Sequence, residues 1–241
     1  MPAIRVMTYQ VNGCRGSDGR VDLERVLDVI HDAAPDLVAL QRFDAPDAKA
    51  VERLAERLGM SWFGDAGGNV ILSCYPLSGL RPYDLGGEGC CLRADVDILG
   101  RRLHLFNVCL SSHPRIRQEQ IGRLLGPDLL GHADLACPLI VLGDFADCGW
   151  GLGNLNLALV LRRARRPLWC GTYPARFPLL GRDRAYLRGE VRVLESSIPR
   201  WGVARHASTH LPLVLTLQAR DPREYLRTKS LSRRRMEIAP G

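Results

Sequence analysis

Asp144 is the residue of this 241-residue chain that is best placed to do chemistry. It follows the apolar run Leu139-Ile140-Val141-Leu142 and Gly143, and such a run predicts a strand buried on both faces. We expect Gly143 to stop that strand and Asp144 to stand at its carboxyl end, where ligands gather in layered α/β folds. A carboxylate is costly to desolvate there, so it requires a cation, a hydrogen-bond donor or a charged partner. The alternative is an aspartate that only caps its own loop.

The elements that must position this residue can be assigned from apolar patterning. Alternating or continuous apolar runs predict strands, and amphipathic spacing predicts helices, the first of which has Asp22 as its N-cap. The expected strands are residues 4–11, 37–41, 69–73, 91–98, 103–108, 139–142, 184–187 and 211–217, and the expected helices are residues 22–33, 48–58, 115–125 and 154–166. With 46% hydrophobic residues, the chain can bury one large core, which is favoured over two small ones.

Composition and the first residues limit the class of protein. No apolar run reaches the roughly 18 residues that are needed to span a bilayer. Residues 1–6 lead directly into a strand pattern without the layout of a signal peptide, so we expect a cytoplasmic protein with no transmembrane segment. None of the eight cysteines belongs to a C-x-x-C pair, which argues against a zinc knuckle and favours reduced, mostly buried thiols.

Positive charge is abundant and unevenly distributed. The net charge is +7, nearly all of the positive charge is arginine, and much of it lies in residues 162–166 and 220–235. Because the last residues lack apolar periodicity, we expect a domain of residues 1–219 and a flexible basic tail of residues 220–241. Such a tail can bind nucleic acid or anionic lipid, although a solvated basic surface is the commoner explanation of the charge.

Several short motifs occur in a definite order along the chain. They are Asn12–Arg20 after the first strand, Pro35–Gln41, Asn69–Ser73 with Tyr75-Pro76, Gly143-Asp144-Phe145, Thr172–Pro178, Asp183-Arg184, and Ala207-Ser208 followed by His210-Leu211-Pro212. This order, over residues 4–217, resembles the bacterial branch of the endonuclease/exonuclease/phosphatase superfamily. The resemblance implies a four-layered α/β sandwich, in which two facing mixed β-sheets are flanked by helices, with one cleft at the strand ends.

In that superfamily the cleft carries out metal-assisted hydrolysis of phosphoesters. A magnesium-type ion, bound by hard oxygen ligands, polarises the phosphate, and an aspartate–histidine pair assists the attacking water. By resemblance, the catalytic residues that remain in this chain are Asp144, Asp183 and His210.

Other positions of the family's site carry different residues here. Gln10 stands where the family's first strand has asparagine, and Arg42 stands where a metal-binding glutamate follows glutamine. Cys109 replaces a histidine, Ala146 replaces the asparagine of Gly-Asp-x-Asn, and Thr209 replaces an aspartate. A guanidinium repels a divalent cation at about 4 Å by several kcal/mol at an effective dielectric constant of about 20. With about one carboxylate left, we expect no metal or other cofactor; Mg²⁺ is the alternative.

These changes leave two functions of different classes. The first is a non-catalytic family member, a pseudoenzyme, that binds a phosphate-bearing ligand or a protein partner through the cleft that is the active site in the family. The second is a divalent-metal-dependent phosphodiesterase or nuclease with residual or rewired activity. Arg42 either binds phosphate directly or pairs with Asp144. The sequence does not define an oligomeric state. The residues that we expect to bind the ligand are Gln10, Asn12, Arg42, Cys109 and Thr209.

Overall fold

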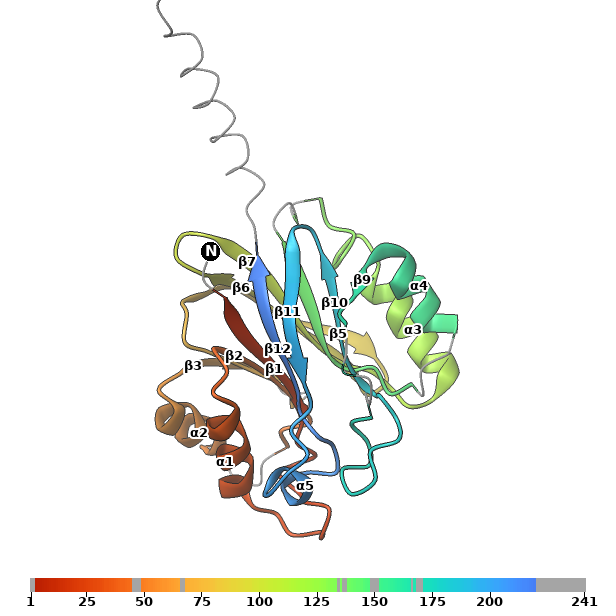
Figure 1. The fold of residues 1–241 in the computed structure, drawn as a ribbon. Helices are drawn as coiled ribbons and strands as arrows, with labels where there is room; N and C mark the ends of the chain where they lie inside the picture. Colours follow the sequence, from red (N-terminus) through yellow and green to blue (C-terminus); the bar gives the residue numbers. More distant parts are fainter. Residues whose placement is uncertain are drawn as a thin grey trace, which may run out of the picture.

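The chain folds into two six-stranded mixed β-sheets that face one another (Figure 1). The computed structural model describes residues 3–44, 49–65, 68–133, 135, 138–147, 152–165, 167 and 171–219. In spatial order, the first sheet consists of β11 (Val191–Ser197), β12 (Leu213–Ala219), β1 (Ile4–Gln10), β2 (Leu37–Gln41), β4 (Val70–Ser73) and β3 (Ser61–Gly64). The second consists of β5 (Leu77–Gly86), β6 (Gly89–Asp97), β7 (Arg102–Cys109), β8 (Leu139–Asp144), β10 (Asp183–Arg188) and β9 (Arg162–Arg163).

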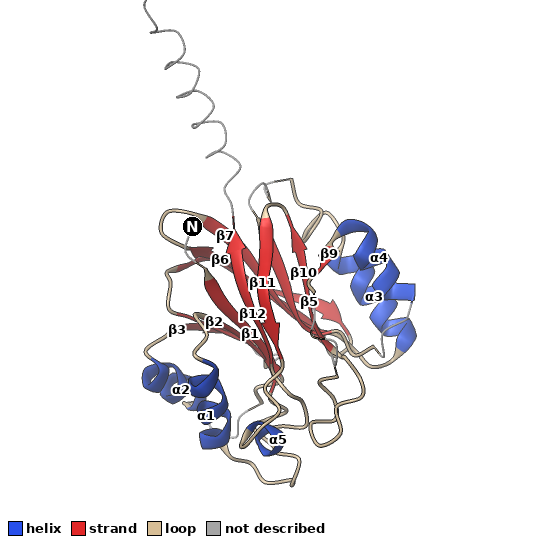
Figure 2. Cartoon of the chain, viewed as in Figure 1, coloured by secondary structure: helices blue, strands red, loops and turns tan. Residues whose placement is uncertain are grey.

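Helices flank the two sheets on their outer sides, which confirms the four-layered α/β sandwich (Figure 2). The first sheet carries α1 (Leu23–Ala33), α2 (Ala50–Leu58) and the short α5 (Ala204–Ala207), and the second carries α3 (Pro114–Leu124) and α4 (Leu152–Val160). The Asp22 side chain accepts hydrogen bonds from two backbone N–H groups of the first turn of α1, as expected of an N-cap. The larger hydrophobic cluster fills the space between the sheets and under α1 and α2, and a smaller one lies under α3 and α4.

The sequence predicts the eight central strands and misses the four strands at the edges of the sheets. The missed strands are β3, β5, β9 and β11. Residues 154–166, which we expected to be helical, are divided between two elements. The helix α4 ends at Val160, and β9 follows it and pairs with β10.

Gly143 lies inside β8 and does not stop it. The strand continues through Asp144, and Gly143 has a φ of 150°. A Cβ atom at this position would lie 1.8 Å from the carbonyl oxygen of Val108 on the neighbouring strand β7. Glycine is therefore required here because two backbones approach too closely for any side chain.

Two expectations from the sequence concern residues outside the described part of the chain. One is the flexible basic tail of residues 220–241, and the other is the reduced, buried state expected of Cys137, Cys148 and Cys170. The five described cysteines are thiols, of which only Cys74 is exposed. None of the described helices has the length and apolar character that would let it cross a membrane.

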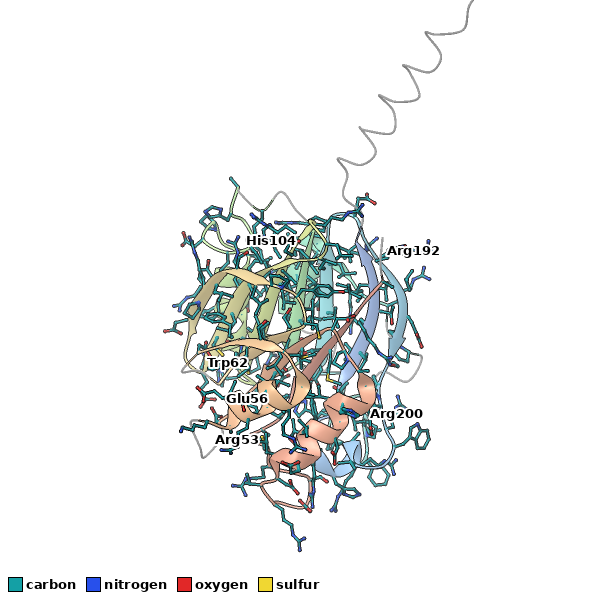
Figure 3. The ribbon with its side chains drawn as sticks, turned by 90° about the vertical axis from the view of Figure 1, so that its left-hand side faces the viewer. Arg53, Glu56, Trp62, His104, Arg192 and Arg200 are labelled. Carbon is teal, nitrogen blue, oxygen red and sulfur yellow. The ribbon has the colours of Figure 1, made fainter. Side chains whose placement is uncertain are left out.

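A buried, hydrogen-bonded pair of ionisable residues lies in the second sheet, at the end where Figure 3 labels His104. His104 Nδ1 is 2.6 Å from Asp95 Oδ1, and both residues are buried. Burial lowers the pKa of His104 and outweighs the opposing effect of Asp95. His104 is therefore neutral in the folded state and donates its Nδ1 proton to the carboxylate.

This lowered pKa predicts a loss of stability in mild acid. In the unfolded chain, histidine gains a proton below a pH of about 6.5, whereas folded His104 resists protonation. The contribution of His104 to the free energy of unfolding is complete above a pH of about 6.5. It is lost as the pH falls through the lower pKa of His104 in the folded state. Urea unfolding at pH 7.5 and 5.5 should show a smaller pH dependence for His104→Gln than for the wild type. The exposed control His31→Gln should keep the wild-type dependence, and equal dependence in all three proteins would contradict this assignment.

Candidate functional site

Four residues form a row across one end of the second sheet. The strand registers place Cys90 of β6 opposite Cys109 of β7, and Cys109 opposite Asp144 of β8. Asp144 is in turn opposite Asp183 of β10. Asn107, two residues before Cys109 and on the same face, contacts the first sheet, so the row faces the space between the sheets. Together with Gln10, Arg42, Arg182 and His210, these four residues make up what we call the strand-end site.

Asp144 is fully buried and is ion-paired with Arg182. Arg182 Nη2 donates to Asp144 Oδ2 at 2.9 Å, and Arg182 Nε donates to Asp144 Oδ1 at 3.3 Å, a two-point contact that suits a planar guanidinium. The same Oδ1 accepts from the N–H of Ala146 at 2.8 Å, so Asp144 also caps its own loop. The Arg182 guanidinium lies over the ring of Tyr173, 5.0 Å from its centroid. The partner that Asp144 requires is therefore Arg182, and of the two alternatives for Arg42, the ion pair with Asp144 is wrong, because Arg42 pairs with Glu88.

Asp183 and His210 form a second buried pair. His210 Nδ1 lies 2.8 Å from Asp183 Oδ2, which places the proton on Nδ1 and leaves Nε2 as the basic nitrogen. The imidazole packs against Tyr173, with ring centroids 4.8 Å apart. The Ser208 hydroxyl donates to the carbonyl of Gln10 and accepts from the N–H of His210. These contacts tie the loop that carries the histidine to the end of β1.

Arg42 follows β2 in the left-handed backbone region, with a φ of 51°. Its carbonyl accepts from the N–H of Gly13 at 2.7 Å, which joins the loops after β1 and β2. The guanidinium, 35% exposed, lies 3.5 Å from the carboxylate of Glu88 and also donates to Cys109. Burial alone would lower the pKa of Arg42, but Cys109, Asp144 and Glu88 outweigh it and raise that pKa. Arg42 therefore stays cationic in the site.

Cys109 lies between Cys90 and Arg42. The hydrogen bond with Cys90 lowers the pKa of Cys109, and Arg42 lowers it further against the opposing effects of burial and Asp144. The same contact raises the pKa of Cys90. Of the two sulfur atoms, Cys109 Sγ is therefore the one that carries negative charge more readily.

Buried amide side chains behind this row link the two sheets. Gln41 Nε2 donates to Asn107 Oδ1 at 2.8 Å and to Thr8 Oγ1 at 3.0 Å. Asn107 Nδ2 donates to the carbonyls of Leu40 and Val70, at 2.7 and 2.9 Å. Because polar groups in a core are stable only with specific partners, this network fixes how β2 and β7 sit across the sandwich.

The structure brings six of the predicted site residues together and places two on neighbouring loops. The six are Gln10, Arg42, Cys109, Asp144, Asp183 and His210. Asn12 lies beyond β1, where its carbonyl accepts from the N–H of Arg15. Thr209 is half-buried, and its carbonyl accepts from the N–H of Ala175.

Sequence reasoning missed two residues of the strand-end site, Arg182 and Cys90, and also Asn107 in the amide network behind it. Arg182 carries no local signal of its role, because its partner is 38 residues away along the chain. Cys90 is recognisable only once the register of β6 and β7 is known. Asn107 did leave a signal, since it is a single amide within an apolar strand.

A divalent ion does not fit the side chains of the strand-end site. Arg182 and the N–H of Ala146 already occupy the oxygens of Asp144, and Arg42 brings a cation to the same space. Magnesium requires several hard oxygen ligands in a near-octahedral arrangement. Within the part of the chain that the structure describes, no three His, Cys, Asp or Glu residues are grouped so that they could hold a metal ion.

The structure is thus an α/β sandwich of two facing sheets, with an aspartate and an Asp–His pair at one end of the second sheet. The chain belongs to the endonuclease/exonuclease/phosphatase family, because the sequence model of that family matches residues 7–212. Members of this family are generally phosphoric ester hydrolases.

The relatives support the same assignment of the fold. The uncharacterized protein YbhP of Escherichia coli K12 is 25% identical over 246 residues, which cover 88% of this chain and 94% of that protein. An endonuclease/exonuclease/phosphatase structure from Beutenbergia cavernae aligns with a TM-score of 0.72 and 23% identity, covering 91% of this chain and 72% of that one. The human Nocturnin catalytic domain, with a bound sulfate anion, aligns with a TM-score of 0.74 and 19% identity, covering 91% and 95%.

Proposed function

We propose that this protein is a non-catalytic member of its family that binds a phosphate-bearing ligand at the strand-end site without a metal ion. The observation that carries the proposal is the environment of Arg42. This cation stands where the family resemblance implies a metal ligand, and its carboxylate partner Glu88 is 82% exposed. An exposed ion pair of this kind contributes about 0–1 kcal/mol, so an incoming phosphate can displace Glu88 at little cost.

The side-chain oxygen of Gln10, a second group in the site, favours a phosphate ligand that still carries a proton. The side chain of Gln10 is 5% exposed, and its Oε1 accepts no hydrogen bond from any described residue. The P–OH group of a phosphate monoanion is a donor that would satisfy this oxygen while the anionic oxygens contact Arg42. The sulfate bound to human Nocturnin, a tetrahedral oxyanion on the same fold, is consistent with such a ligand.

The scale of the affinity follows from the same contacts. Hydrogen bonds to charged groups contribute about 1.5–3 kcal/mol each, before the cost of immobilising the ligand. Arg182 adds little, because Asp144 already neutralises it. Weak binding of inorganic phosphate, in the millimolar to high-micromolar range, is therefore the expectation.

We expect phosphate titration followed by NMR to locate this site. Signals of Gln10, Arg42 and His210 should shift in the wild type without added metal. Arg42→Ala should abolish the shifts, because it removes the guanidinium that is not paired with a buried carboxylate. Arg192→Ala is the matched control, since Arg192 is exposed and lies at the end of the sandwich where His104 lies (Figure 3). Unchanged affinity in Arg42→Ala would contradict the proposal.

The alternative is a metal-dependent phosphodiesterase or nuclease with residual activity, and the intact Asp183–His210 pair is the observation in its favour. Hydrolysis of bis(4-nitrophenyl) phosphate separates the two functions. A non-catalytic protein should leave this diester at the background rate with Mg²⁺ or Mn²⁺ present. Metal-dependent turnover that is lost in Asp144→Asn would establish the alternative.

A further inference from the structure

The two thiols at the end of β6 and β7 are placed for a reaction that the proposed function does not use. Cys90 and Cys109 are directly opposite in the antiparallel ladder and face the same side of the sheet. Opposite residues in such a ladder have Cα atoms about 4.5 or 5.5 Å apart. Disulfides have a Cα separation of roughly 4.4–6.8 Å, so the register places this pair at a spacing that a disulfide can bridge.

The surroundings of the pair make one sulfur a nucleophile and the other its resolving partner. Cys109 accepts hydrogen bonds from the Cys90 thiol and from the Arg42 guanidinium, and both favour its thiolate. Cys90 keeps its proton and is the more exposed of the two, at 9% against 2% for Cys109. Only a small oxidant can reach such a pair, and a peroxide is little larger than water.

We infer that Cys90 and Cys109 are a redox-active dithiol, which hydrogen peroxide converts reversibly to a disulfide across β6 and β7. In the first step the Cys109 sulfur attacks one peroxide oxygen, the O–O bond breaks, and the leaving hydroxide takes a proton to become water. Cys109 is then a sulfenic acid. In the second step the Cys90 sulfur attacks the Cys109 sulfur, and the sulfenic oxygen leaves as a second water. Two thiols and one peroxide thus give one disulfide and two waters.

This reaction needs no metal ion and no bound phosphate, so it is independent of the proposed function. It also has an internal control in Cys91. That residue neighbours Cys90 in the chain, but it points to the other face of β6, into the cluster under α3 and α4. Position in the sequence does not distinguish the two cysteines, whereas the direction of their side chains does.

The test is peptide mapping of the full chain after hydrogen peroxide treatment, with remaining thiols alkylated under denaturing, non-reducing conditions. We expect a cross-linked peptide that joins residues 90 and 109, identified by fragmentation between residues 90 and 91 and lost on treatment with dithiothreitol. The cross-link should persist in Cys91→Ala and disappear in Cys90→Ala, in which Cys109 should advance to the sulfinic acid.

Three results would overturn the inference. The first is full alkylation of Cys109 in the peroxide-treated wild type. The second is oxidation of wild-type Cys109 to the sulfinic acid without a cross-link, and the third is a cross-link that runs through Cys91. Because mapping of the wild type locates the bond by itself, a variant that failed to fold would not prevent a decision. Circular dichroism before and after treatment checks that the reaction occurs in the folded protein.

Discussion

Replacing Gly143 by alanine is expected to cost about 3 kcal/mol or more of unfolding free energy. The added Cβ would lie 1.8 Å from the carbonyl oxygen of Val108, which belongs to the backbone of β7 in the centre of the second sheet. A flexible side chain could move away, but a paired strand cannot do so without losing its hydrogen bonds to β8. The variant should unfold at a much lower urea concentration than the wild type, or fail to fold.

Gly100→Ala is the matched control for Gly143→Ala. Gly100 also has a positive φ, of 79°, but no atom lies within 4 Å of the position where its Cβ would be. The control therefore measures backbone strain alone, which is about 1–2 kcal/mol in the left-handed region. If both variants lost the same stability, backbone strain at positive φ would explain the loss in each. That result would contradict the assignment of the larger loss to the close approach of β7 and β8.

Arg182→Leu is expected to destabilise the protein by about 3–5 kcal/mol, the range for removing one partner from a buried ion pair. The reason is that Asp144, which is fully buried, would remain as a charge that has lost its ion-pair partner, with the N–H of Ala146 as its remaining donor among the described residues. Equilibrium unfolding in guanidinium chloride or urea measures the loss. The exposed Arg192→Leu should change stability by no more than about 0.5 kcal/mol.

The double variant Arg182→Leu with Asp144→Asn tests this reason for the loss. Asparagine keeps the shape of the side chain and can still accept a hydrogen bond from the N–H of Ala146, but it carries no charge that would be buried without a partner. The double variant should recover most of the stability that the single change removes, because the two effects are coupled. Additive losses in the cycle would show that Arg182 stabilises the fold by packing, for example on Tyr173, and not by pairing with Asp144.

For the fold, the sequence by itself determined the central strands. Segments such as Leu37–Gln41 and Leu139–Leu142 are buried on both faces, so their apolar residues run without interruption and identify them. The edge strands carry no such pattern. Most of β5 and both residues of β9 are exposed, and such residues become strands because a neighbouring strand offers hydrogen bonds, not because their own composition favours it.

For the site, the sequence placed Asp144 at the end of a central strand, and the resemblance to the family implied that Asp183 and His210 lie in the same site. The sequence could not determine the partners of the site residues. Asp144 pairs with Arg182 and not with Arg42, and Cys109 meets Cys90, because strand register and loop path decide which side chains meet. Gly143 also illustrates the difference between sequence and structure. The sequence shows that a glycine is present, but the reason why glycine is required, the nearby carbonyl of Val108 on β7, exists only in the folded protein.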